Sequence, residues 1–166
     1  MNHKLSHRIS HRVFHLLALV ILVGSLGLTA PALTAQAPIT NKNVKKRIAL
    51  MLSAQDAVAI LGDMMAGRMV FNAAKARAAR RVLVQTSSRI SRRFRTPHQD
   101  PQSHARPEIW TYWDDFSARA EISEQAARQL SVSSLNGLRH SLPNLLHSCL
   151  SCHQRFRVEP NEFITH

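Results

Sequence analysis

The segment 149–153, with the sequence Cys-Leu-Ser-Cys-His, holds the residues with the clearest chemistry in this chain. Cys149 and Cys152 are its only two cysteines, and His153 directly follows the second. C-x-x-C-H is the attachment signature of a c-type haem. The thiols can add to the two vinyl groups of the porphyrin, and the neighbouring imidazole can then bind the iron. The segment therefore predicts one covalently attached haem c, with its iron, per chain.

The same residues are compatible with three other kinds of site. A Cys-x-x-Cys pair can be a dithiol redox site, but such sites stand at a helix N-terminus after a strand. Two cysteines with His147 and His153 can bind zinc, which would need the context of a metal-binding loop. A disulfide between Cys149 and Cys152 would be strained if both lie on one helix. The adjacent histidine favours haem among these four interpretations.

Residues 1–32 have the order of a secretory signal peptide. Lys4, Arg8 and Arg12 form a positive start, and an apolar run over 13–28 follows. Small residues come next, so we expect cleavage between about residues 32 and 37. The apolar run is short for a membrane span, which needs about 20 residues, although an uncleaved anchor is the alternative. A periplasmic location is therefore predicted, in a compartment that permits oxidised cysteines.

Helical periodicity recurs four times over 38–166, the part of the chain that follows the signal peptide. The predicted helices span about 43–66, 73–94, 107–130 and 134–156. Gly67 is typical of a helix stop, and Asn72 and Ser133 or Ser134 are typical N-caps. Pro143 is expected to bend or split the last helix. The pattern predicts an all-α fold, an antiparallel four-helix bundle, with an arginine-rich, histidine-containing loop over 95–106.

The charge of the chain indicates the kind of partner. It has 22 Lys and Arg against 10 Asp and Glu, a net charge of +12. This balance suits an acidic protein partner or an anionic membrane surface, whereas export argues against nucleic acid. No catalytic triad, phosphate-binding loop or carboxylate pair suited to acid–base work stands out in the sequence. We therefore expect a carrier or binding protein, not an enzyme.

The C-terminal segment 149–157, Cys-Leu-Ser-Cys-His-Gln-Arg-Phe-Arg, resembles the class II c-type cytochromes, the cytochrome c′ family. Arg47 with Met51, and the segment 107–110 with Phe116, are similar to the starts of the family's first and third helices. The resemblance covers about residues 43–159. Members of that family are themselves standard examples of the four-helix bundle. The arginine-rich second helix and Pro143 depart from the family pattern.

The resemblance implies roles for several residues. In the family the position of Met51 faces the distal side of the haem, where one low-spin branch uses a methionine thioether as sixth iron ligand and transfers electrons. The other branch keeps five-coordinate iron and binds nitric oxide or carbon monoxide. Arg47 shares a helix face with Met51 and is expected at a haem propionate. Arg157 is expected beside the proximal pocket, and Trp110 and Phe116 near the porphyrin.

Electron transfer is thus the expected function, with His153 as the proximal iron ligand and Met51 as the second ligand. Gas binding at five-coordinate iron is the alternative, and a haem-free dithiol oxidoreductase is a remote alternative. The partners that these interpretations imply are an acidic redox protein, a small gas and, from the family, a second copy of the chain through the first two helices.

Overall fold

The computed structural model describes residues 38–158, and every structural statement below concerns that part of the chain. The predicted signal peptide lies outside the described residues. The described segment is all-α, as predicted, and the only β pairing there is an isolated bridge between Ala105 and Arg157. The helices are α2 (Lys42–Met65), α3 (Ala73–Ser87), α4 (Ile90–Phe94), α5 (Glu108–Thr111), α6 (Trp113–Arg128) and α7 (Leu135–Phe156).

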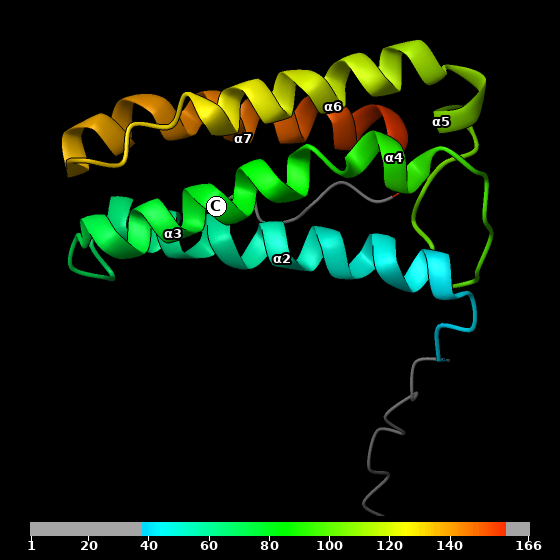
Figure 1. Cartoon of the computed structure of the whole chain (residues 1–166), viewed down its shortest axis with the longest axis horizontal. Helices are drawn as coiled ribbons and strands as arrows, with labels where there is room; N and C mark the ends of the chain where they lie inside the picture. Colours follow the sequence, from blue (N-terminus) through cyan, green and yellow to red (C-terminus); the bar gives the residue numbers. More distant parts are fainter. Residues whose placement is uncertain (1–37, 159–166) are drawn as a thin grey trace, which may run out of the picture. The chain divides into compact units, whose positions relative to one another are not determined.

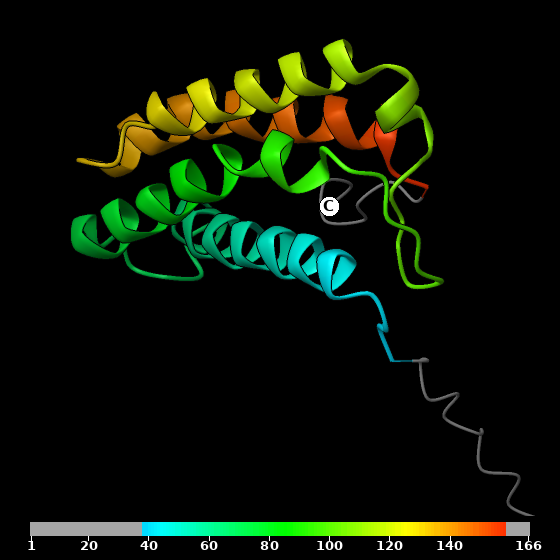
Figure 2. The same cartoon turned by 45° about the vertical axis from the view of Figure 1, so that its right-hand side comes forward.

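The long helices α2, α3, α6 and α7 lie side by side, and helices consecutive in the chain run in opposite directions (Figures 1 and 2). α2 packs against α3, α3 against α6, and α6 against α7. The α2–α3 and α6–α7 connections lie at one end of the bundle. The start of α2, the short helices α4 and α5, and the end of α7 lie at the other. The antiparallel four-helix bundle is therefore confirmed.

Short polar residues set the helix ends where the sequence indicated. The side chain of Asn72 accepts a hydrogen bond from the backbone N–H of Lys75, and that of Ser134 accepts one from Gly137. These bonds satisfy N–H groups that have no partner within the first helical turn. α2 ends just before Gly67, whose φ is 76°. Residues with a side chain rarely adopt this left-handed conformation, which explains the glycine stop.

The predicted second helix, 73–94, is interrupted between α3 and α4. The Thr86 hydroxyl donates to the carbonyls of Val82 and Leu83, and the Ser88 hydroxyl donates to that of Gln85. Side chains of this kind compete with the backbone for helical acceptors. The backbone N–H of residue 89 then bonds to the Thr86 carbonyl, a tighter i to i−3 pattern that marks the end of a regular helix.

The predicted third helix is likewise divided, into α5 and α6. Tyr112 lies between them with φ −116° and ψ 52°, outside the helical region. The fourth helix, by contrast, is continuous, so the predicted split at Pro143 is wrong. The carbonyl that loses its partner belongs to Arg139, and both residues are exposed. Water can therefore satisfy that carbonyl, and one proline does not end the helix.

Buried apolar residues form two clusters. The larger one runs through the middle of the bundle and draws on all four long helices. The smaller, here called the aromatic cluster, lies at the end where α4, α5 and the last turn of α7 meet. Its buried members are Phe94, Ile109, Phe116 and Phe156.

By length and composition, α2 is apolar enough to cross a bilayer, with a mean hydropathy of 1.4 over an 18-residue window. A core helix of a soluble bundle has the same properties. Here α2 packs against α3, α4 and α7, and its residues Leu61 and Met64 are buried in the larger cluster. We therefore describe it as a bundle helix.

Candidate haem-binding site

Cys149 and Cys152 lie one turn apart on α7, half-buried and not joined by a disulfide. Cys149 packs against the larger core cluster, whereas Cys152 packs against the aromatic cluster. Burial raises the pKa of the Cys149 thiol, and burial with the neighbouring Cys149 raises the pKa of Cys152 to about 11. Reactive dithiols have a lowered thiol pKa, so this environment does not favour a dithiol redox site.

His153 has binding capacity that the polypeptide does not use. Its side chain is half-buried, and its Nδ1 atom is buried with no hydrogen-bond partner among the described residues. Most buried polar atoms in proteins have a partner. Burial, and secondarily the positive charge of Arg157, lower the pKa of this imidazole. The neutral form, which is the form that binds metals, is therefore favoured, and these residues fit a covalently attached haem.

The aromatic cluster places flat apolar side chains against the segment 149–153, where Cys152 contacts it. The ring centroid of Phe116 lies 5.3 Å from that of Phe94, 5.3 Å from that of Phe156 and 5.7 Å from that of Trp113. These three neighbours come from α4, α7 and the first residue of α6. Apolar and aromatic side chains with few polar groups are typical of cofactor pockets. The cluster can therefore line a porphyrin.

The structure brings Met51 and Trp110 to this cluster, as it does Phe116 and Cys152. Met51 is half-buried on α2. Trp110, on α5, donates from its indole Nε1 to the carbonyl of Phe94 over 2.7 Å, which fixes the indole ring against the end of α4. Four residues expected near the haem therefore share one cluster, although the roles of Met51 and Trp110 toward iron and porphyrin remain predictions.

Arg47 is buried, with only 2% of its surface exposed. Its Nε donates to the carbonyl of Arg93 over 3.0 Å, its Nη1 to that of His98 over 3.2 Å, and its Nη2 to that of Thr96. Its guanidinium also lies 4.8 Å from the ring centroid of Phe94. In this structure Arg47 thus connects α2 to the chain that leaves α4, and its contact with a propionate remains a prediction.

Arg157 follows the last residue of α7 and is half-buried. It forms the isolated bridge with Ala105, and the N–H of Val158 donates to the carbonyl of His104 over 2.8 Å. The end of α7 is therefore held against the loop 95–106. The positive charge of Arg157 contributes, after burial, to the lowered pKa of the His153 imidazole, and its position beside a proximal haem pocket stays a prediction.

Arg119 also reaches the segment 149–153, a contact that the sequence did not predict. On α6, its Nε lies 2.8 Å from Asp115 Oδ1, and its Nη1 donates to the carbonyl of Ser151 over 3.3 Å. Ser151 lies between the two cysteines. The spacing of Asp115 and Arg119 indicates an ion pair on one helix face, but no local signal indicates the contact with α7.

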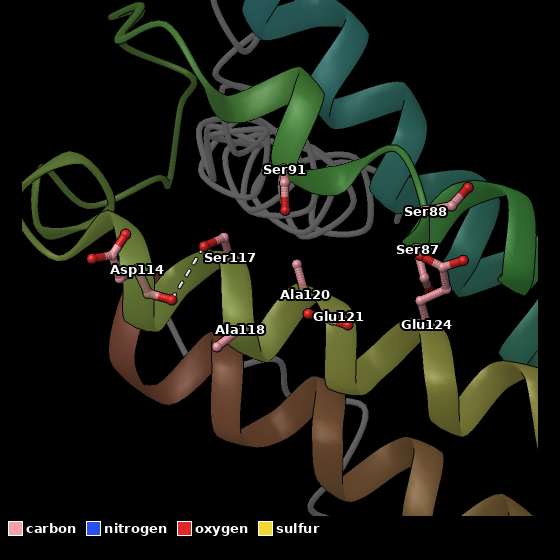
Figure 3. A pocket seen from close by; sticks show the side chains of 9 residues that line it. All are labelled: Ser87, Ser88, Ser91, Asp114, Ser117, Ala118, Ala120, Glu121 and Glu124. Atoms are coloured by element: carbon pink, nitrogen blue, oxygen red, sulfur yellow. Dashed lines mark hydrogen bonds between the residues drawn. The ribbon is translucent and has the colours of Figure 1, made fainter.

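A polar groove of about 300 Å³ lies on another side of the bundle, between the α3–α4 junction and α6 (Figure 3). None of the predicted haem-site residues lines it. It is therefore separate from the candidate site. Its lining consists of four serines, three acidic residues and two alanines: Ser87, Ser88, Ser91, Asp114, Ser117, Ala118, Ala120, Glu121 and Glu124.

The zinc alternative finds no support in the arrangement of side chains. Over residues 38–158, no three or more His, Cys, Asp or Glu side chains come together in a group that could hold a metal ion. A structural zinc site needs four such ligands. His147 is exposed on α7, so the two cysteines and His153 lack the additional ligands that zinc would require.

Comparison with known proteins agrees with this site. The family model described as Cytochrome C′ matches residues 42–157, from the start of α2 to the residue after α7. The chain belongs to the cytochrome c′ family. It is accordingly a haem protein with covalently attached haem c, and Cys149 and Cys152 are the only cysteines of its sequence. Among curated proteins, no match to this cytochrome is found.

Solved structures share the fold of this cytochrome. Cytochrome c′ from Rhodobacter spheriodes is 23% identical, with a TM-score of 0.65 over 70% of this chain and 95% of the other. Cytochrome c556 from R. palustris is 19% identical, with a TM-score of 0.65 over 72% and 98%. A nitric oxide complex of a cytochrome c′ mutant from Alcaligenes xylosoxidans is 24% identical, with a TM-score of 0.63 over 70% and 94%.

Proposed function

We propose that this cytochrome is a periplasmic electron carrier, not an enzyme, with His153 and Met51 as the two axial ligands of its haem iron. The observation that carries the proposal is the common position of Met51 and Cys152 against the aromatic cluster. The two residues come from α2 and α7, which contact each other in the bundle. A thioether on the helix facing the attachment segment can serve as the sixth ligand of haem iron.

When bound, haem supplies a one-electron ferric–ferrous couple, whose potential the protein adjusts through axial ligands and burial. The residues of this chain supply the rest. Cys149 and Cys152 would hold the group covalently, and the neutral imidazole of His153 would bind its iron. The thioether of Met51 would favour the ferrous state. The rings of Phe116 and its neighbours exclude water.

Replacement of Met51 by leucine tests the proposal, because leucine keeps the apolar volume but removes the sulfur. We expect the wild-type ferric protein to be low-spin and Met51→Leu to be high-spin by visible absorption and electron paramagnetic resonance. Met65→Leu is the matched control, since Met65 is also half-buried on α2 but packs against the larger cluster. A wild type that is already high-spin, or a low-spin Met51→Leu protein, would contradict ligation by Met51.

Gas binding at five-coordinate iron is the second candidate, and the same cluster supports it. Apolar, aromatic surroundings suit a small uncharged diatomic ligand, and three of the similar structures are nitric oxide complexes. In that case Met51 would only fill space. Ferrous protein would then bind carbon monoxide rapidly and at equal rates in wild type and Met51→Leu. A wild type that binds much more slowly than the variant would instead support displacement of a methionine ligand.

Export is tested separately. Expression of the full chain in a bacterium that attaches haem c should give coloured protein in the periplasmic fraction. Its N-terminal sequence should begin between about residues 32 and 38 if the signal peptide is cleaved. Retention of the full-length chain in the membrane fraction would support the uncleaved anchor instead.

A further inference from the structure

Positive charge is concentrated on α3 and α4. Between Met64 and Gln99 the sequence contains no acidic residue but eight arginines and one lysine. Five of these arginines are exposed on α3, on α4 and at the turn between them. In Figure 1, α4 continues roughly along the direction of α3, so the five arginines are distributed along one consecutive stretch of the bundle. We call this surface the arginine ridge; its members are Arg77, Arg81, Arg89, Arg92 and Arg93.

The guanidinium groups of the ridge make no polar contact with the described residues. Neither a salt bridge nor a side-chain hydrogen bond involves any of its five guanidinium groups there, whereas Arg119 and Arg128 on α6 are paired with acids. Arg77 and Arg81, four residues apart, repel each other and disfavour the helix that carries them. These arginines take part in the fold through their main chains, as when the Arg93 carbonyl accepts from Arg47 and the Arg89 N–H donates to Thr86. Exposed charges kept at some cost to the helix indicate a role toward another molecule.

We infer that the arginine ridge is the docking surface for an acidic electron-transfer protein. The inference deepens the proposed function, and it rests on that function being correct. Arginine presents a flat fork of donors that matches carboxylates, is weakly hydrated, and is enriched in protein interfaces from which lysine is depleted. The composition of the ridge is that of an interface. The lysines of this cytochrome gather elsewhere, as at Lys42, Lys45 and Lys46 on α2.

The position of the ridge also suits electron transfer. Arg93 is followed by Phe94, which is 7% exposed and packs in the aromatic cluster. The Phe94 ring lies 5.3 Å from that of Phe116, and Cys152 contacts the same cluster. The aromatic cluster therefore connects α4 with the segment 149–153. A partner seated over α4 would approach the haem closely, and the arginines farther along α3 would orient it.

An acidic protein is favoured over the two other anionic partners. A membrane surface attracts lysine and arginine alike through their charge, which would not account for eight arginines against one lysine. Nucleic acid is disfavoured by the predicted export. Electrostatic complementarity acts mainly on association rate and specificity. Removal of the ridge charges should therefore lower the rate of electron transfer with an acidic partner.

The test uses the purified holoprotein and, as probe, a reduced flavodoxin with an acidic surface around its flavin. Haem reduction is followed by stopped-flow absorbance at low and high ionic strength. The ridge variant is Arg89→Glu with Arg92→Glu. Its matched control, with the same change in net charge, is Lys46→Glu with Arg139→Glu, at two exposed positions on α2 and α7. Thermal unfolding shows that the variants remain folded.

At low salt we expect the ridge variant to react with flavodoxin about tenfold more slowly than wild type, and the control variant less than about threefold more slowly. High salt should reduce this difference, because exposed charges are screened. Equal slowing of both variants would show that only the overall charge matters and would overturn the inference.

Two further measurements separate the remaining outcomes. An uncharged hydroquinone should reduce all three proteins at the same rate. If it reduces none of them, the electron-carrier function itself fails, and the inference falls with it.

Vesicles of phosphatidylglycerol and phosphatidylcholine in equal amounts test whether the ridge binds a membrane surface. A ridge variant that loses vesicle binding but keeps its rate with flavodoxin would identify a membrane surface instead and would overturn the docking proposal.

Discussion

The guanidinium of Arg47 lies over the rings of both Phe94 and Trp110, 4.8 Å and 5.3 Å from their centroids. These rings belong to α4 and α5, so one side chain of α2 joins three of the elements that contribute residues to the aromatic cluster. The same guanidinium donates to three main-chain carbonyls. Its charge is therefore compensated by dipoles and ring faces in a buried position.

Replacement of Arg47 by alanine should lower the free energy of unfolding by about 2–4 kcal/mol, because three carbonyls lose a charged donor. Arg47→Lys should recover only part of this loss, since an ammonium group cannot reproduce the guanidinium fork. Urea unfolding of the holoprotein measures both. Lys46→Ala, at the neighbouring exposed position, is the control and should change stability by less than about 0.5 kcal/mol. If Arg47→Ala also changed the free energy of unfolding by less than about 0.5 kcal/mol, the contacts of Arg47 would contribute little to stability.

Trp110→Phe should remove the hydrogen bond to the Phe94 carbonyl and keep an aromatic ring in the cluster. We expect a loss of about 1–2 kcal/mol in unfolding free energy, since the carbonyl is left without that donor. Trp113→Phe is the natural comparison, because Trp113 packs against Phe116 at 5.7 Å but has no indole hydrogen bond in the described structure. Equal effects of the two substitutions would argue against a specific role for the 2.7 Å bond.

The two cysteines give a prediction about mass and colour. Cys149→Ala combined with Cys152→Ala should leave no haem on the polypeptide after denaturation, as judged by mass spectrometry. The reason is that covalent attachment requires the two thiols. His153→Ala, by contrast, should reduce haem incorporation or change the spectrum while leaving any attached haem covalent. Haem that stays attached through denaturation in the double variant would contradict the assignment of Cys149 and Cys152.

Asp100 predicts a dependence of stability on acid pH. Its carboxylate accepts hydrogen bonds from the N–H groups of Asn41 and Gln102 and from Thr40, and these bonds hold its pKa below the ordinary value. The stabilisation is fully present above the unfolded pKa of about 3.9 and is lost as pH falls through the lower folded pKa.

Asp100→Asn should therefore be less stable than wild type at neutral pH, and the two should converge as pH falls below about 4. Denaturant unfolding at pH 7, at 4 and at lower values would measure the difference, with Asp56→Asn, on the exposed side of α2, as the control. A difference that is independent of pH would assign the effect to local packing and not to the charge.

Two glycines of the α2 region should respond to alanine in opposite directions. Gly67 has a φ of 76°, so Gly67→Ala should cost about 1 kcal/mol of stability. Gly62 lies inside α2, and a Cβ there would meet nothing within 4 Å. Gly62→Ala should therefore stabilise the protein by about 0.5–1 kcal/mol through helix propensity. Thermal melting of the two variants measures both effects. A Gly67→Ala protein as stable as wild type would contradict the role of Gly67 as a helix stop.

The sequence by itself determined the four-helix bundle and the haem-attachment segment, because both depend on local spacing. Apolar periodicity, the caps at Asn72 and Ser134 and the stop at Gly67 are encoded within a few residues of where they act. The C-x-x-C-H pattern likewise depends on chemistry that one helical turn holds together. The break after Ser87 also has a local cause, but the competing hydroxyl bonds of Thr86 and Ser88 are not distinguishable in sequence from those of ordinary helical residues.

Only the tertiary structure decided which groups Arg47 contacts, that Arg119 donates to the Ser151 carbonyl, and that Asp100 accepts a hydrogen bond from the Asn41 N–H. Each of these contacts joins residues from separate elements, and their partners are backbone groups, which carry no residue-specific signal in the sequence. A carbonyl or an N–H looks the same at every position. Its accessibility to a distant side chain depends on how the helices pack, and that follows from burial summed over the whole bundle.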